Sequence, residues 1–328
     1  MKPLCIYHSN CADGFGAAWV VWKHFKGEVD FFPGVYQRPP PDARGRHVIF
    51  VDFCYKSDVM IKLSETTRSI LVLDHHKTAM EDMRVTTPED EDRYIFSVPV
   101  EASFSTYTGD FESPLRNSRD IWVLFDMERS GAGITWDFFN PGQPRPKLID
   151  HIEDRDLWRW ALPFTREIQA AVFSYPYDFN IWDALMQSEE AVLDELRMEG
   201  VGIERKHHKD IAELIEVVTR PMRIRIPNPA LAYDYVVVPV ANLPYTLTSD
   251  AGHLLCERDW NGKRWNVEPK FHPFAACYWD IPEGRVFSLR SRADGADVGA
   301  IAVLHGGGGH AHAAGFRVPY DRLYEFEP

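Results

Sequence analysis

Residues of the types that bind metal ions follow four apolar runs of this sequence. They are His8 with Asp13, then Asp52, then the triplet Asp74-His75-His76, and finally Asp154 with Asp156. Carboxylates and imidazoles without a cysteine set suit hard or borderline divalent ions such as Mn2+ or Mg2+. If the apolar runs are parallel strands, their carboxyl ends meet at one edge of a sheet. The pattern therefore predicts a metal site suited to metal-assisted hydrolysis of a phosphoester.

The elements needed to position these residues are visible in the hydrophobic pattern of the first 125 residues. Short apolar runs predict strands over 3–7, 47–53 and 69–74, and a further apolar run covers 121–125. Helical spacing predicts helices over 14–25 and 57–65, the second with Ser57 as its N-cap. Alternation of strand and helix indicates an α/β fold with a parallel sheet, flanking helices and right-handed crossovers.

The remaining pattern predicts a two-domain chain, in keeping with its 328 residues. The first domain covers 1–220, with an irregular insertion at about 80–120 that forms a lid or a small hairpin, and with helices over 147–160 and 191–218. A linker is expected over 221–232, where prolines gather. A smaller α/β domain over 233–328 follows, and we expect the active site in the cleft between the two domains.

The glycine run near the end of the chain predicts a phosphate-binding loop. Glycines have no Cβ, so the backbone N–H groups of Gly307, Gly308 and Gly309 can approach a phosphate closely. His310 then stands next to the substrate, and Arg290 at a strand end can hold a phosphate with its planar guanidinium. The competing interpretation is a flexible glycine loop without a ligand.

The motifs HSNCADG, VIFVD, LVLDHH and IEDRDLW resemble those of the DHH phosphoesterase superfamily. The C-terminal SLRS and GGGGHAHAAGF resemble its DHHA1 domain, so the similarity covers nearly the whole chain outside the 80–120 insertion. The resemblance implies a metal-dependent phosphoesterase of the RecJ-like or oligoribonuclease-like kind, whose DHHA1 domain binds the substrate.

The resemblance also implies a role for individual residues. The implied metal ligands are His8, Asp13, Asp52, His75 and Asp154, with Asp156 as a neighbouring candidate for the last position. Asp52 is implied to bridge two ions and to act in catalysis, and His76 to face the substrate. Ser288, Arg290, Gly307, Gly308, Gly309, His310 and His312 are implied to bind the substrate.

One residue departs from the family pattern and affects the metal count. Cys11 stands where the first motif usually carries an aspartate. A thiolate prefers softer ions than Mg2+. The resemblance implies two Mn2+ or Mg2+ ions, and Cys11 is the reason why a single ion is the alternative.

Composition limits the partners of the chain. A net charge of −13 excludes a polyanion-binding field over the whole surface, which argues against long duplex DNA as the main substrate. Five scattered cysteines without a CxxC pair predict no disulfide and a reducing compartment. With no signal-peptide layout and no run long enough to span a bilayer, we expect a cytoplasmic protein, either monomer or homodimer, that does not bind membranes.

The leading expectation is hydrolysis of short oligonucleotides or single-stranded nucleic acid. The alternatives within the enzyme class are a cyclic-dinucleotide phosphodiesterase and a nucleotide phosphomonoesterase. From another class, a nucleotide-binding sensor with a decayed metal site is the competing interpretation, and Cys11 is the residue that supports it.

Overall fold

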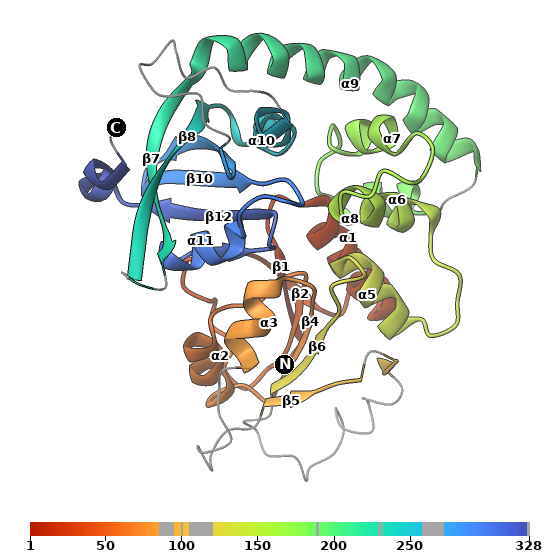
Figure 1. The fold of residues 1–328 in the computed structure, drawn as a ribbon. Coiled ribbons are helices and arrows are strands. Elements are labelled where there is room, and N and C mark those ends of the chain that lie inside the picture. Colours follow the sequence, from red (N-terminus) through yellow and green to blue (C-terminus); the bar gives the residue numbers. More distant parts are fainter. Residues whose placement is uncertain are drawn as a thin grey trace. The chain divides into compact units, whose positions relative to one another are not determined.

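The computed structural model describes residues 1–84, 95–99, 101–104, 121–187, 190–228, 230, 232–257 and 272–326. The chain divides into two compact units, residues 1–204 and 205–328, each with its own sheet (Figure 1). The α/β class with a parallel first sheet and a smaller second unit is confirmed.

The sheet of the first unit is parallel in every described pairing. Its six strands follow the order β2-β1-β3-β4-β6-β5. The strands are β1 (Leu4–His8), β2 (Asp30–Gly34), β3 (His47–Val51), β4 (Ser69–Asp74), β5 (Ile95–Ser97) and β6 (Ile121–Phe125). The carboxyl ends of β1, β3 and β4 carry His8, Asp52 and Asp74, so the topology places these residues at one edge, as the sequence predicts.

Helices cover both faces of this sheet because its strands alternate two apolar faces. Cys5, Ile49 and Leu71 belong to one core cluster, together with residues of α1, α5 and α6. Ile6, Phe50 and Val72 belong to the opposite cluster with residues of α2 and α3. The helices are α1 (Ala12–His24), α2 (Ser57–Ser64), α3 (Lys77–Arg84), α5 (Gly131–Phe139), α6 (Lys147–Asp156), α7 (Thr165–Val172) and α8 (Phe179–Leu185).

The long helix α9 (Glu190–Val218) contains the boundary between the units, and the second unit has a mixed sheet. Its strand order is β11-β12-β10-β9-β8-β7, with β8 parallel to β9 and the other described pairs antiparallel. The strands are β7 (Thr219–Asn228), β8 (Ala232–Asn242), β9 (Ala275–Ile281), β10 (Gly284–Arg290), β11 (Gly308–Gly309) and β12 (Ala313–Val318). The helices α10 (Thr248–Glu257) and α11 (Val298–Leu304) belong to separate core clusters, one with Ala275 and one with Phe287.

The structure corrects three predictions about elements. The expected linker 221–232 is wrong, since 221–228 lies in β7, whose Pro221 and Pro227 are tolerated because β7 is an edge strand. Ser57 is the first residue of α2 rather than its N-cap, and its backbone N–H donates to Asp82 Oδ2 at 2.6 Å. Of the expected insertion at 80–120, α3 extends to Arg84 and β5 is a strand, while residues 85–94, 100 and 105–120 lie outside the described part.

Two expectations about the whole chain concern membranes and disulfides. Among the described residues, no helix combines the length and the apolar character needed to cross a bilayer. All five cysteines are described, and each is a free thiol.

Candidate metal centre

Asp52 lies at the centre of the carboxyl edge of the first sheet. It directly follows β3 with a φ of 53°, a left-handed conformation that is uncommon outside glycine and costs about 1–3 kcal/mol where the surroundings enforce it. Its side chain is buried, and its Oδ2 has no hydrogen-bond partner within the described residues. His8 Nδ1 lies 3.5 Å from this oxygen. A buried carboxylate oxygen that accepts no hydrogen bond is suited to a metal ion.

Three carboxylates surround one nitrogen of His75. His75 Nε2 lies 3.1 Å from Asp52 Oδ1, 3.4 Å from Asp156 Oδ2 and 3.7 Å from Asp13 Oδ2. Candidate ligand atoms of Asp13, Asp52 and His75 all lie within 4.8 Å of one another. The group is made of three buried side chains, and it provides the oxygen and imidazole ligands that Mn2+ accepts.

A second group of ligand atoms shares Asp52 with the first. His8, Asp52 and His76 also bring one candidate atom each within 4.8 Å of the others. His76 Nδ1 lies 3.8 Å from Asp52 Oδ1, and His8 Nδ1 lies 3.5 Å from the other oxygen, Oδ2. Two groups that share one carboxylate are the arrangement in which an aspartate can bridge two ions.

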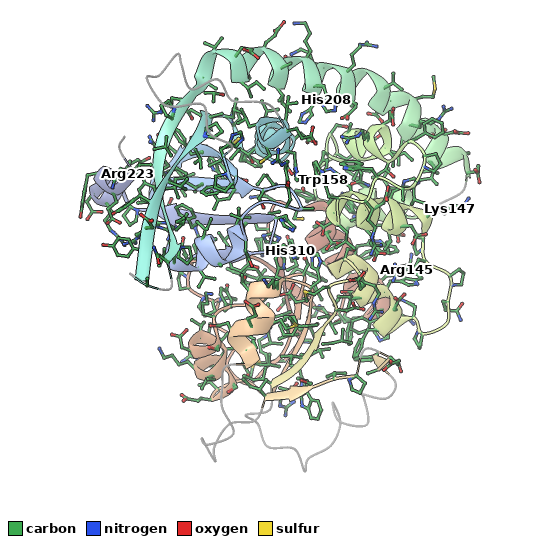
Figure 2. All side chains as sticks on the ribbon, in the orientation of Figure 1. Arg145, Lys147, Trp158, His208, Arg223 and His310 are labelled. Atoms are coloured by element: carbon green, nitrogen blue, oxygen red, sulfur yellow. The ribbon has the colours of Figure 1, made fainter. Side chains whose placement is uncertain are left out.

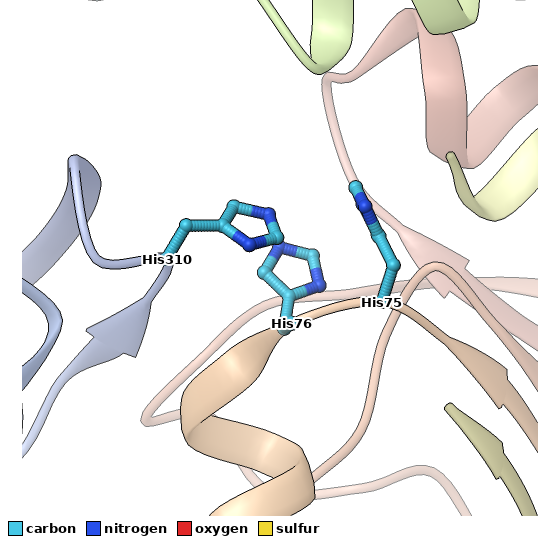
Figure 3. A group of neighbouring side chains, drawn as sticks. All are labelled: His75, His76 and His310. Atoms are coloured by element: carbon cyan, nitrogen blue, oxygen red, sulfur yellow. The ribbon is translucent and has the colours of Figure 1, made fainter. Parts of the chain in front are cut away.

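Asp74 holds the two histidines of the triplet in place. Its Oδ1 accepts hydrogen bonds from the backbone N–H of His75 at 2.8 Å and from His76 Nδ1 at 2.7 Å. Both rings extend from the segment that joins β4 to α3 (Figure 3). Because Nδ1 of His76 donates to Asp74, Nε2 is the nitrogen of that ring with acceptor or acid–base capacity.

The N-terminus of α5 fixes the carboxylate of Asp13. Gly131 N–H donates to Asp13 Oδ2 at 2.6 Å, and Ala132 N–H donates to Oδ1 at 2.9 Å. A Cβ at position 131 would lie 2.4 Å from Asp52 Cβ and 2.9 Å from Asp13 Oδ2, so the close approach requires glycine. The helix start at Ser130-Gly131 is therefore occupied by a carboxylate of the chain itself.

Ion pairs behind α5 hold this helix start in position. The Ser130 N–H donates to Glu153 Oε2 at 3.0 Å, and the same oxygen accepts from Arg145 Nη1 at 3.1 Å. Arg145 also binds Asp137 through Nε at 2.9 Å. Sequence reasoning missed Gly131, Ala132 and Glu153 as parts of the site; the SGAG motif was the available signal, and its geometry depends on a residue 118 positions away.

Mutual proximity shifts the pKa values of the clustered groups. Burial, followed by the charges of Asp52 and Asp156, raises the pKa of Asp13 well above its usual range. Burial opposes ionisation of Asp52, but the hydrogen bond from His75 and the nearby imidazole of His8 outweigh it and lower the pKa of Asp52. Burial would lower the pKa of His75, yet its bond to Asp52 and the nearby carboxylates raise it well above the usual value. A positive charge is thus favoured at the position of His75 Nε2.

The structure brings Asp156 into the cluster and gives Asp154 another role. The Asp154 carboxylate accepts from Ala161 N–H at 2.7 Å, Leu162 N–H at 3.2 Å and Thr165 Oγ1 at 2.6 Å. These bonds hold the loop after α6 and the first residue of α7, so the prediction that Asp154 is a metal ligand does not agree with this geometry. Asp156, two residues later, supplies the carboxylate beside His75.

Cys11 belongs to neither group of candidate ligands among the described residues. Burial and the charges of Asp52 and Asp156 raise the pKa of its thiol well above the usual value, so the sulfur stays protonated. A protonated thiol is a poor metal ligand.

In the second unit, the end of β10 lies next to the turn after β11. Arg290 pairs in register with Ala313, and Ser288 pairs with Gly315. The Arg290 guanidinium donates to Ser288 Oγ and Ser249 Oγ, both at 3.1 Å, and Ser291 Oγ lies 2.9 Å from His312 Nδ1. His310 follows β11, and its backbone N–H donates to Ala313 O at 2.8 Å (Figure 2). Arg290, Ser288, His310 and His312 thus share one end of this sheet.

The glycine run is shaped by packing within the second unit. A Cβ at Gly307 would lie 2.0 Å from Gly315 O, and one at Gly309 would lie 2.6 Å from Ala313 O. Gly309 also has a φ of 140°, which side chains rarely adopt. These two glycines are required by β12, whether or not a phosphate binds. The substrate-binding role of Gly307, Gly308 and Gly309 stays a prediction.

Comparisons with known proteins give one relative in sequence and several distant structural similarities. No protein-family model matches the chain. The chain is 28% identical to uncharacterized protein R106 of Acanthamoeba polyphaga mimivirus over 95% of its own length, and it spans 66% of the length of that relative.

The structural similarities are weaker. A pGpG-specific phosphodiesterase, PggH of Vibrio cholerae, is 14% identical with a TM-score of 0.40, and covers 98% of this chain and 95% of its own. Exonuclease RecJ bound to manganese is 12% identical with a TM-score of 0.40, and covers 98% of this chain and 87% of its own.

Proposed function

We propose that this chain is a metal-dependent phosphoesterase of the DHH superfamily. The observation that carries the proposal is the sharing of Asp52 between two groups of ligand atoms, Asp13-Asp52-His75 and His8-Asp52-His76. The sequence motifs on which the family resemblance rests supply five of these residues in the expected order. The strained backbone of Asp52 agrees with this role, because such strain concentrates at functional sites.

The proposed ligands are Asp13, Asp52, His75 and Asp156 on one side and His8 with Asp52 on the other. When bound, Mn2+ or Mg2+ ions supply an activated water and neutralise negative charge on a phosphoryl group. Asp52 would contribute its carboxylate to both positions, and the α5 amides hold Asp13 in a fixed orientation. His75 binds through Nε2, which requires loss of the proton that the surrounding carboxylates favour in the absence of metal.

His76 is the proposed acid–base residue. Its Nδ1–H donates to Asp74, which fixes the ring orientation and leaves Nε2 to hold or release a proton. A proton on Nε2 can be passed to the leaving oxygen of a phosphoester.

The proposed substrates are short oligonucleotides or single-stranded nucleic acid. The net charge of −13 favours a local phosphate site over a long duplex surface. In the second unit, Arg290 and His310 are the proposed phosphate-binding residues, because a guanidinium and an imidazole lie at one end of the same sheet. Cyclic dinucleotides and nucleotide monophosphates are the alternatives.

The experiment measures Mn2+-dependent hydrolysis of dinucleotides, cyclic dinucleotides, mononucleotides and longer single strands. Asp52→Asn should abolish turnover and weaken Mn2+ binding, since it removes the shared carboxylate charge. Asp58→Asn is the matched control, because the Asp58 carboxylate is 70% exposed on α2, away from the ligand groups. Absence of metal-dependent cleavage of any of these substrates by the wild-type chain would refute the proposal.

A nucleotide sensor is the second candidate, and the position of Cys11 favours it. The first motif contributes only His8 and Asp13 to the ligand groups, while the protonated Cys11 belongs to neither. For a sensor, purified protein would carry no metal, and Asp52→Asn would leave nucleotide binding unchanged. Metal content and equilibrium dialysis of a nucleotide therefore separate the two functions.

A further inference from the structure

The loop after Asp156 has a backbone conformation that bulky side chains rarely adopt. Trp158, Trp160 and Phe164 have φ values of 56°, 53° and 65°. Three large left-handed residues within seven positions are strained, and such strain persists only where the surrounding structure enforces it. Trp158 marks the start of this loop in Figure 2.

Asp154 enforces the conformation of this loop. Its carbonyl oxygen accepts from Arg159 N–H at 2.8 Å and from Trp160 N–H at 3.3 Å. Its carboxylate holds Ala161, Leu162 and Thr165, as described above. The buried Asp154 thus stabilises the conformation of this aromatic loop, which begins two residues after Asp156 of the candidate metal centre.

The loop and the helices beside it present aromatic rings paired with arginines. The Arg166 guanidinium lies 3.8 Å from the ring centre of Trp160, Arg197 lies 4.8 Å from Phe164, and Arg155 lies 4.5 Å from Phe173. The Phe164 side chain is 52% exposed and that of Phe173 is 43% exposed. We call these three pairs the aromatic–arginine surface.

We propose that the aromatic–arginine surface binds single-stranded nucleic acid, with bases stacking on Phe164 and Phe173. Stacking platforms combined with cationic side chains are the chemistry by which proteins hold single strands without reading their sequence. Arg155, Arg166 and Arg197 place guanidinium groups beside these rings, where phosphates can compete with the carboxylates that now pair with two of them. Arg166 Nη1 lies 3.9 Å from Glu204 Oε1, and Arg197 Nε donates to Asp194 Oδ1 at 3.2 Å. The inference deepens the proposed function, because it makes the substrate of the nearby metal centre a strand of several nucleotides.

The test measures binding of a fluorescent oligothymidylate of about 12 nucleotides by anisotropy, in EDTA so that no cleavage occurs. Phe164→Asn removes the ring and keeps a residue that tolerates the left-handed backbone. Phe173→Ser and Arg197→Gln test the surface at two positions of ordinary backbone. Tyr245→Ser is the matched control, since this ring is 53% exposed in the second unit and is not among the three pairs.

Each phenylalanine variant should weaken binding about fivefold or more, as expected for loss of one stacked base, and the control should bind like the wild type. Thermal unfolding of each variant confirms that it folds. Binding by Phe173→Ser and Arg197→Gln within about twofold of the wild type would overturn the proposal. The proposal would also be overturned if both substitutions disrupt a concentration-dependent dimer while oligonucleotide binding stays unchanged.

The two proposals fail in different ways. Mn2+-dependent cleavage of dinucleotides without binding of the longer strand would overturn this surface and leave the proposed function standing. Strand binding that depends on Phe164 and Phe173, without cleavage of any phosphoester, would support the surface and overturn the proposed activity.

Discussion

Replacing Gly131 by alanine would place a methyl group inside the candidate metal centre. The new Cβ would lie 2.4 Å from Asp52 Cβ, and 2.9 Å from both Asp52 Cα and Asp13 Oδ2. Backbone at Asp52 cannot move cheaply, because that residue is already left-handed and its N–H donates to Leu73 O at 2.9 Å. Overpacking of this kind costs about 1–3 kcal/mol of unfolding free energy.

The same substitution should damage metal binding more than it damages stability. To accommodate the methyl group, the carboxylate of Asp13 must leave the Gly131 N–H to which it is bound at 2.6 Å. Loss of a partner that orients a ligand lowers metal affinity about 10–100-fold. Calorimetric titration with Mn2+ measures the affinity, and urea unfolding in EDTA measures the stability.

Gly202→Ala is the matched control for Gly131→Ala. A Cβ at Gly202 in α9 would have nothing within 4 Å, so the alanine should stabilise the helix by up to about 1 kcal/mol. Its Mn2+ affinity should equal that of the wild type. If Gly131→Ala binds Mn2+ within about threefold of wild-type affinity, Asp13 does not depend on α5 and the reasoning is refuted.

Three further predictions concern single side chains. Asp156→Asn should weaken Mn2+ binding without loss of stability. Asp154→Asn should instead lower the unfolding free energy by about 2–4 kcal/mol, because it breaks buried bonds to the following loop. If Mn2+ titration and urea unfolding show the reverse pattern, Asp154 is the ligand. Burial lowers the pKa of His305 to about 4 from 6.5. Neutral His305 therefore contributes to the unfolding free energy above pH 6.5. This contribution, at most about 3 kcal/mol, is lost as the pH falls towards 4. His305→Phe should flatten this part of the unfolding profile, and an unchanged slope would contradict it. Gly307→Ala should lower the unfolding free energy by about 3 kcal/mol or more, since its Cβ would lie 2.0 Å from Gly315 O, and a melting temperature equal to the wild type would contradict this.

The sequence predicts the parts of the fold that are specified by local pattern. Apolar runs locate β1, β3, β4 and β6, and helical spacing locates α1, α2, α6 and α9. The strands β2 and β7 were missed because each contains proline, which is tolerated at the edge positions that both strands occupy. Edge position is a property of the assembled sheet and leaves no local signal.

In the candidate site, too, the sequence alone does not determine which of two neighbouring carboxylates joins the cluster. His8 ends β1, while Asp52, His75 and His76 come directly after β3 and β4, so strand direction brings these four residues to one edge. Asp13 joins them from the first turn of α1, which follows β1 after a short loop. Asp154 and Asp156 lie at the end of a helix, where two residues make a difference of about 200° around the axis. Which of the two faces the cluster is decided by the loop that follows, and that loop is held by tertiary hydrogen bonds.

The hydrogen bonds between Asp13 and the N-terminus of α5 have a consequence for the order of folding. The carboxylate and the amides that hold it are 118 and 119 positions apart in the chain. Between them, β6 pairs with β4 and leads directly into α5, so the position of α5 depends on this pairing. During synthesis, the first half of this unit therefore leaves the ribosome with several acidic residues gathered at an unfinished edge. The centre is completed only when the chain has passed Asp156, so we expect metal capture to be a late event that locks an already assembled sheet.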